Sequence, residues 1–234
     1  ELDGETIRRL LWFRNDSPLI CCRVEGRAAE RRTLTLRFAT GLPPGQLVMD
    51  TVGGVIVRPL QRIYAPTFWS LQHFVHLQDA ANDRGIAIFL ATPGAVSCQP
   101  DGGLEIVALR NATSERAFGL FPLLGLPAVG HEESACTFDY ALLFTEAGNW
   151  RDNKIPFIAR SVFDNPWDTT GRAELRKLAS SIVTTDQPEV FVTAVKPASR
   201  GNGLIVRLST PTSLGIPVNL NINDHPLKAA FLCD

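Results

Sequence analysis

The chain has 234 residues, a mass of 25.6 kDa and a formal net charge of -1, with 45% hydrophobic and 20% charged residues. This balance provides no electrostatic surface for nucleic acid or for an acidic membrane. Glycine (18) and proline (16) interrupt the chain too often for a bundle of long helices. The uncharged stretch 117–130 contains two prolines and is too short to span a bilayer.

Alternating apolar and polar residues predict a series of short strands. The pattern occurs in segments 33–38, 85–89, 104–109, 190–195 and 204–208. Turn residues separate these segments, and the pairs Asp101-Gly102 and Asn202-Gly203 predict hairpins. The sequence therefore favours an antiparallel all-β fold.

Only segment 170–182 has helical spacing, with Leu175, Leu178 and Ile182 on one side. We expect a helical bridge at 171–183 between a large β domain, 1–170, and smaller carboxy-terminal strands, 184–234. Because the chain begins at Glu1 without Met and stops directly after an apolar run, we also expect both ends to be cuts in a longer polypeptide.

The cysteines suggest a reducing compartment. They are scattered and include no C-x-x-C pair: Cys21, Cys22, Cys98, Cys136 and Cys233. A chain of this size has no need of disulfides to stabilise its core, so we expect buried thiols. Together with the lack of a signal segment, this predicts a cytoplasmic location.

Side chains for metal or catalytic chemistry are few. His73 and His76 are three residues apart, a spacing that sends the two rings to opposite faces of a strand and favours separate histidines over a zinc pair. Asp79 and Asp83 flank a predicted turn, where solvated loop acids are the common case. No nucleophile elbow, P-loop or dinucleotide-binding glycine motif occurs. We therefore predict no catalytic residue and no metal site in this chain.

Seven short segments in a fixed order resemble one known family. They are 53–59 (GGVIVRP), 66–70 (PTFWS), 74–79 (FVHLQD), 85–89 (GIAIF), 104–110 (LEIVALR), 138–142 (FDYAL) and 194–208, which contains AVKP and LIVRL. Together they resemble the carboxy-terminal β region of glycoside hydrolase family 38, the α-mannosidases, over most of the chain. Two details depart from the family pattern: Ser70 replaces a proline, and segment 90–94 replaces an N-D-G turn.

The resemblance implies a large antiparallel β-sandwich of the supersandwich, galactose mutarotase-like type, followed by a smaller β-sandwich portion. It also implies a parent enzyme that is a retaining α-mannosidase, with a carboxylate nucleophile, an acid/base residue and a zinc ion in an amino-terminal domain. No segment here matches that domain. The expected partners are the catalytic domain of the same polypeptide and an α-mannoside or oligosaccharide substrate, in a parent that can be homo-oligomeric. By itself this chain is expected to be inactive and to hold no cofactor.

The resemblance points to three residues that contact substrate. Arg110 ends a strand whose arginine approaches the catalytic pocket in this family, although a solvated strand-end arginine is an equal alternative. Phe68 and Trp69 can provide an apolar platform for a sugar ring, although packing in the core or at a domain interface is the commoner use of such a pair. Arg58 and Arg116 are weaker candidates. The alternative function is a stand-alone carbohydrate-binding or interaction module that uses Trp69 or Trp167.

Overall fold

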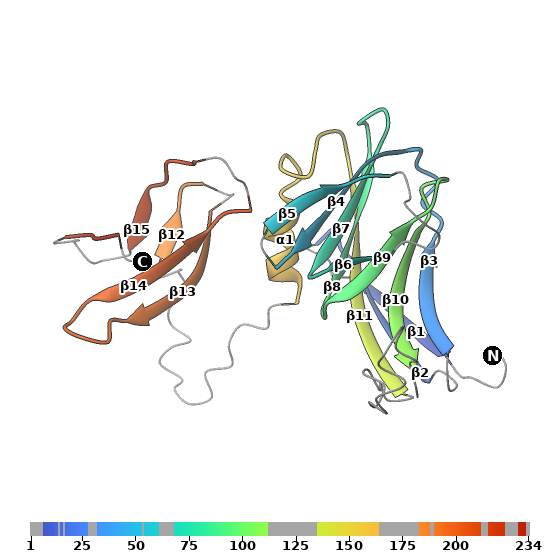
Figure 1. The fold of residues 1–234 in the computed structure, drawn as a ribbon, viewed down its shortest axis with the longest axis horizontal. Coiled ribbons are helices and arrows are strands. Elements are labelled where there is room, and N and C mark those ends of the chain that lie inside the picture. Colours follow the sequence, from blue (N-terminus) through green and yellow to red (C-terminus); the bar gives the residue numbers. More distant parts are fainter. Residues whose placement is uncertain are drawn as a thin grey trace, which may run out of the picture. The chain divides into compact units, whose positions relative to one another are not determined.

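The computed structural model of the chain describes residues 7–13, 15, 17–27, 32–52, 54–60, 68–111, 135–163, 183–187, 190–211, 215–222 and 229–232. The chain divides into two compact units, Glu1–Phe163 and Asp164–Asp234. Strands dominate both units, and α1 is the one helix among the described residues (Figure 1).

The larger unit contains a seven-stranded antiparallel sheet. Its strands lie in the order β1 (Ile7–Phe13), β2 (Ile20–Arg27), β11 (Ala135–Thr145), β8 (Gly85–Leu90), β7 (Phe74–Asp79), β4 (Pro44–Thr51) and β5 (Gly54–Arg58). Each neighbouring pair runs antiparallel. The order places β1 and β5 at the two edges of the sheet (Figure 1).

A four-stranded antiparallel sheet packs against the first. Its order is β3 (Arg32–Phe38), β10 (Leu104–Asn111), β9 (Gly94–Cys98) and β6 (Trp69–Leu71). The β9–β10 hairpin turns at Gly102, where φ is 81° and a Cβ atom would collide with the carbonyl oxygen of Leu42. Asp101 accepts a hydrogen bond from the Gly103 amide at 2.9 Å. The turn thus requires the residues from which the hairpin was predicted.

The main core fills the space between the two sheets. Met49, Val75 and Ile88 come from the larger sheet, and Val96 and Ile106 come from the smaller one. All six residues of β7 and all six of β8 are buried, so both faces of these central strands are covered. The result is a β-sandwich with a further layer on one outer face.

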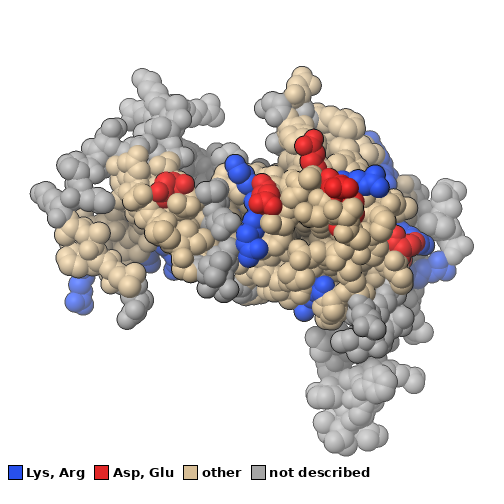
Figure 2. Space-filling view, turned by 90° about the horizontal axis from the view of Figure 1, so that it is seen from above, with Lys and Arg blue, Asp and Glu red and all other residues tan. Residues whose placement is uncertain are grey.

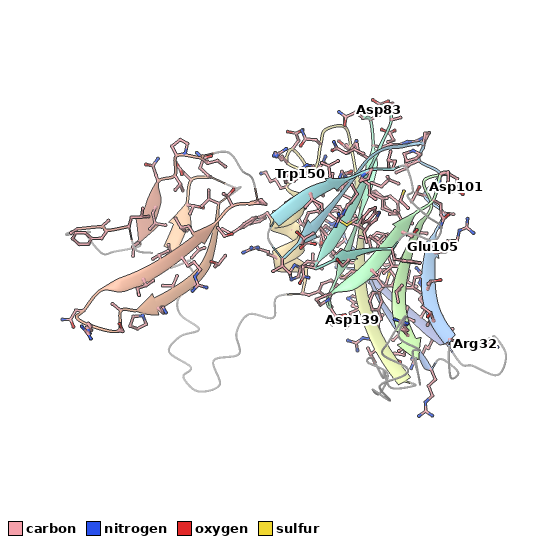
Figure 3. All side chains as sticks on the ribbon, viewed as in Figure 1. Arg32, Asp83, Asp101, Glu105, Asp139 and Trp150 are labelled. Carbon is pink, nitrogen blue, oxygen red and sulfur yellow. The ribbon has the colours of Figure 1, made fainter. Side chains whose placement is uncertain are left out.

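Helix α1 (Ile155–Val162) forms part of that outer layer. A proline in its first turn suits a helix start, because the fixed φ is already helical and the missing N–H has no partner there. Ile155 and Ala159, one turn apart, are buried and pack with Phe74 of β7 and with Trp150, which is labelled in Figure 3. The helix buries the face that the sandwich core leaves uncovered.

The smaller unit contains two two-stranded antiparallel ribbons in its described residues. One pairs β12 (Val183–Thr185) with β15 (Leu220–Ile222), and the other pairs β13 (Phe191–Pro197) with β14 (Leu204–Ser209). The second ribbon turns through Gly201, where φ is 76°, and closes with a hydrogen bond of 2.8 Å from the Ala198 amide to the Gly203 carbonyl.

The predicted all-β antiparallel sandwich is confirmed, as are all five strand segments and both hairpins. The helix expected at 170–182 lies outside the described residues. The expectation of a single helix missed α1, because Pro156 within a short apolar run does not suggest a helix from sequence alone. The boundary predicted near residue 170 stays a prediction, while the compact units divide after Phe163.

Candidate functional site

The aromatic pair expected to contact sugar lies at one edge of the sandwich. Phe68 and Trp69 are half-buried, and Trp69 packs against the main core. The guanidinium of Arg58, at the end of β5, lies over the Trp69 ring, 4.5 Å from its centroid. This contact joins the two sheets at their edge. Because protein occupies one face of the indole, the geometry favours packing over a sugar platform.

Arg58 itself has an unusual environment. Its Nε atom is buried and has no hydrogen-bond partner among the residues that the structure describes. A buried donor without a partner is costly, and the contact with the Trp69 ring offsets part of this cost. The sequence placed Arg58 below Arg110 as a candidate, yet it is Arg58 that lies beside the aromatic pair.

Arg110 lies apart from that pair because of a β-bulge. Strand β10 pairs with β3 through Ile106 and Leu36, but the register shifts between Val107 and Leu109, so that Leu109 faces Leu34. Ile106 faces the core, so in a regular strand, where side chains alternate between the two faces, residue 110 would also face the core. The bulge instead places Leu109 in the core and leaves Arg110 exposed on the outer face of the sheet.

The separation follows from the strand register. Trp69 lies opposite Val96, which lies opposite Ile106, and Arg110 is four residues further along β10. The Cα atoms of Trp69 and Arg110 are thus separated by two inter-strand spacings across the sheet and by three to four residues along β10, depending on how the bulge is counted. These two components together give a distance of roughly 14 to 16 Å. The structure therefore does not bring the three predicted contact residues together in one site.

His76 on β7 is a fully buried titratable side chain in the larger unit. Its residue is 0% exposed, and Nε2 lies 3.1 Å from Oγ1 of Thr145 on β11. Nδ1 is buried with no hydrogen-bond partner among the described residues. Burial lowers the pKa of His76 to about 4, so the ring is neutral at physiological pH. Gly85 makes room for it, since a Cβ there would lie 2.8 Å from Nε2.

The remaining candidate groups have structural partners. Nδ1 of the exposed His73 lies 2.8 Å from Asp50, whose carboxylate also accepts the backbone amides of residues 73 and 74. The buried Asp79 accepts the Asp83 amide at 2.9 Å and holds the β7–β8 turn. His73 and His76 therefore have separate environments. Within the described ranges, no three His, Cys, Asp or Glu side chains are grouped as a metal ion requires.

The described residues form two exposed apolar surfaces. The edge patch is Leu11, Trp12 and Phe13 at the end of β1. The ribbon face is one side of the β13–β14 ribbon, where the register places six apolar residues together: Val192, Val195, Pro197, Leu204, Val206 and Leu208. Four of these six are exposed and the other two are half-buried. Alternation in the sequence identifies such faces but does not reveal whether anything covers them.

The described surface carries charges of both signs. Figure 2 shows small groups of basic and acidic side chains separated by wide uncharged areas. The strongest pair joins Arg23 of β2 to Asp139 of β11 through two hydrogen bonds of 2.7 and 2.8 Å; Asp139 is labelled in Figure 3. This pairing raises the pKa of Arg23. In the described part of the chain, no helix has the length and hydropathy needed to cross a membrane.

Comparison with solved structures identifies the fold. An α-mannosidase from Enterococcus faecalis V583 superposes with a TM-score of 0.73 at 20% sequence identity, covering 95% of this chain and 25% of the mannosidase. A glycosyl hydrolase family 38 protein from Enterococcus faecalis gives a TM-score of 0.69 at 19% identity, covering 94% of this chain and 26% of that protein. The chain has the fold of one region of these mannosidases.

The mannosidase fold confirms the fold predicted from the seven sequence segments. The chain spans about a quarter of the length of the two similar structures. No protein-family profile and no curated protein matches the sequence. At this level of identity the likeness concerns the fold, and the chemistry of the chain has to be argued from its own residues.

Proposed function

We propose that this chain is a non-catalytic β region of an α-mannosidase-like glycoside hydrolase. One observation carries the proposal: 95% of the chain superposes on a solved α-mannosidase, but only 25% of that mannosidase is covered. The rest of such a protein would supply the catalytic domain, and this chain would pack beside it as a β scaffold and form one wall of the sugar cleft.

The ribbon face supports the proposal. Val195, Leu204 and Leu208 are 42%, 46% and 37% exposed on a ribbon of only two strands. A two-stranded ribbon is marginally stable unless its apolar face packs on something else. A further part of a larger mannosidase chain is the partner that we propose for this face.

The residues described here do not fit a zinc site of their own. His76 is enclosed by protein and His73 is held by Asp50. The described ranges also contain no group of three possible donor side chains. We propose that the zinc of the enzyme is bound by its catalytic domain.

An activity assay tests the proposal. The 234-residue chain is expected to leave an aryl α-mannoside intact, whereas the native protein, captured from its source cells with an antibody against this chain, cleaves it. Native protein without activity, combined with glycan binding by the isolated chain, would favour a stand-alone carbohydrate-binding module instead. If that binding used the predicted aromatic pair, Trp69→Ala would abolish it.

Within the proposed enzyme, we propose that Arg110 contacts substrate, as the resemblance implies; it is exposed on the outer face of the four-stranded sheet. Loss of a charge-assisted hydrogen bond to substrate in Arg110→Gln is expected to raise the KM of the full-length enzyme at least about tenfold. Arg37→Gln is the matched control, since Arg37 is another exposed arginine on the same face. Equal KM values for the two variants would remove Arg110 from the substrate site.

A further inference from the structure

Strand β1 is the last strand at one edge of the seven-stranded sheet in the described part of the chain. Among the described residues, β2 is the only strand that pairs with it. Leu11, Trp12 and Phe13 are 53%, 38% and 70% exposed along this edge. Folded proteins usually protect an open edge with charges, a proline or a covering segment, because its free N–H and C=O groups can pair with another chain. Three consecutive large apolar residues instead favour pairing of this edge with another chain.

We propose that β1 pairs antiparallel with β1 of a second copy of this chain, joining two seven-stranded sheets across a two-fold axis. The two-fold axis is perpendicular to the joined sheet, so the same face of β1 lies on the same side of the sheet in both copies. Residues directly opposite each other across the interface therefore point to the same face of the joined sheet. Centring the pairing on Leu10, the middle residue of β1, aligns all seven residues of the strand.

The register centred on Leu10 is complementary in chemistry. On one face, Arg8 of each copy lies opposite Trp12 of the other, which places a guanidinium beside an indole twice in the dimer. On the other face, Ile7 lies opposite Phe13 and Arg9 lies opposite Leu11. No two like charges face each other across these pairs.

Neighbouring registers are worse. Centring the pairing on Arg9 places the two Arg9 side chains directly opposite each other, and like charges in that position destabilise a sheet. Centring it on Leu11 aligns only residues 9–13, five of the seven in the strand. The arrangement of arginines at one end and aromatic residues at the other therefore selects one register of a symmetric pair.

Sedimentation equilibrium of the 234-residue chain measures the proposed dimer directly, with no need for an activity assay. We expect a concentration-dependent species of twice 25.6 kDa. Trp12→Lys places a lysine opposite Arg8 of the other copy and is expected to weaken dimerisation at least tenfold. Trp12→Glu places a carboxylate opposite the same arginine, which gives two Glu–Arg pairs in the dimer, and is expected to retain dimerisation. Val57→Lys is the control, because Val57 is 57% exposed on the opposite edge strand, β5.

A cross-link tests the register. Directly opposite residues of an antiparallel pair have Cα atoms about 4.5 to 5.5 Å apart, within the range of a disulfide. Leu10→Cys is therefore expected to give a covalent dimer under oxidising conditions, well above the yield of the unmodified chain with its native cysteines or of Val57→Cys.

The outcomes separate this interface from other contacts. Loss of the dimer in Trp12→Lys but not in Trp12→Glu, together with the Leu10→Cys cross-link, would establish the proposed pairing. A monomer at all concentrations would overturn it. So would a dimer that Leu204→Lys abolishes and Trp12→Lys does not, because that dimer would form through the ribbon face. None of these results changes the mannosidase proposal, which depends on the native protein and its activity.

Discussion

The two units of this chain bury their apolar side chains to very different extents. In the larger unit, β7 and β8 are buried along their whole length, between a sandwich core and an outer layer that includes α1. In the smaller unit, β14 has the same kind of apolar sequence, but five of its six residues are exposed. Similar strand sequences thus contribute differently to stability, because the number of layers around a strand determines what it buries.

The largest expected difference concerns one substitution made in both units. Leu77→Ala in β7 removes a side chain that is 0% exposed and is expected to cost about 3 to 4 kcal/mol of unfolding free energy. Leu204→Ala in β14, where the leucine is 46% exposed, is expected to change stability by about 0.5 kcal/mol or less. Denaturant unfolding followed by tryptophan fluorescence measures both. Equal losses would show that the ribbon face is covered within this chain.

The buried histidine gives the larger unit a pH dependence. Its pKa is lowered to about 4 in the folded state, while the unfolded chain has the ordinary value near 6.5. Between these two pH values the unfolded state binds a proton that the folded state does not. The contribution of the neutral His76 to the free energy of unfolding is therefore fully present above about pH 6.5. It is lost as the pH falls to about 4, and the loss is at most about 3 kcal/mol.

His76→Gln tests this dependence. The variant is expected to show a flatter stability profile between pH 6.5 and 4 than the unmodified chain in urea unfolding at several pH values. An unchanged slope in His76→Gln would mean that another group causes the acid sensitivity.

A glycine pair makes a third comparison between the units. In Gly85→Ala, the new Cβ would lie 2.7 Å from Thr145 Oγ1 and 2.8 Å from the Leu77 carbonyl oxygen. This overpacking is expected to cost about 2 kcal/mol. Gly215→Ala in the smaller unit meets nothing within 4 Å and should be nearly neutral. Thermal unfolding of the two variants would show whether the space beside His76 is as tight as the geometry indicates.

The smallest effect is expected at Asp186 in the smaller unit. Its exposed carboxylate accepts hydrogen bonds of 2.8 and 2.6 Å from Asn219, and these bonds lower its pKa. Asp186→Asn should raise amide exchange near the β12–β15 ribbon and leave exchange in peptides 74–90 unchanged. A change in both places would indicate that the two units unfold together.

The sequence predicted the backbone of this fold better than its surfaces. Alternation and turn residues located β3, β8, β10, β13, β14 and two hairpins, because strand period and turn chemistry are local properties. The bulge between Val107 and Leu109 was not visible, since it depends on the pairing of β10 with β3. It leaves Arg110 exposed on the outer face of the four-stranded sheet.

The candidate site shows the same limit. Residue type drew attention to Trp69, whose role in sugar binding stays a prediction. The stacked guanidinium of Arg58 comes from a different sheet, and only the assembled sandwich brings the two together. The edge patch and the ribbon face are likewise properties of sheet order, which determines the strands that end without a neighbour. Order and register are long-range features that local patterns do not contain.

The mass of the native gene product tests the central claim most directly. An antibody raised against this chain can detect that product in a denaturing gel of its source cells. Because the chain covers 25% of the solved mannosidase, we expect a band at roughly four times 25.6 kDa that carries α-mannosidase activity after capture. A single band at 25.6 kDa, with no heavier species, would contradict the account and favour an independent β-sandwich module.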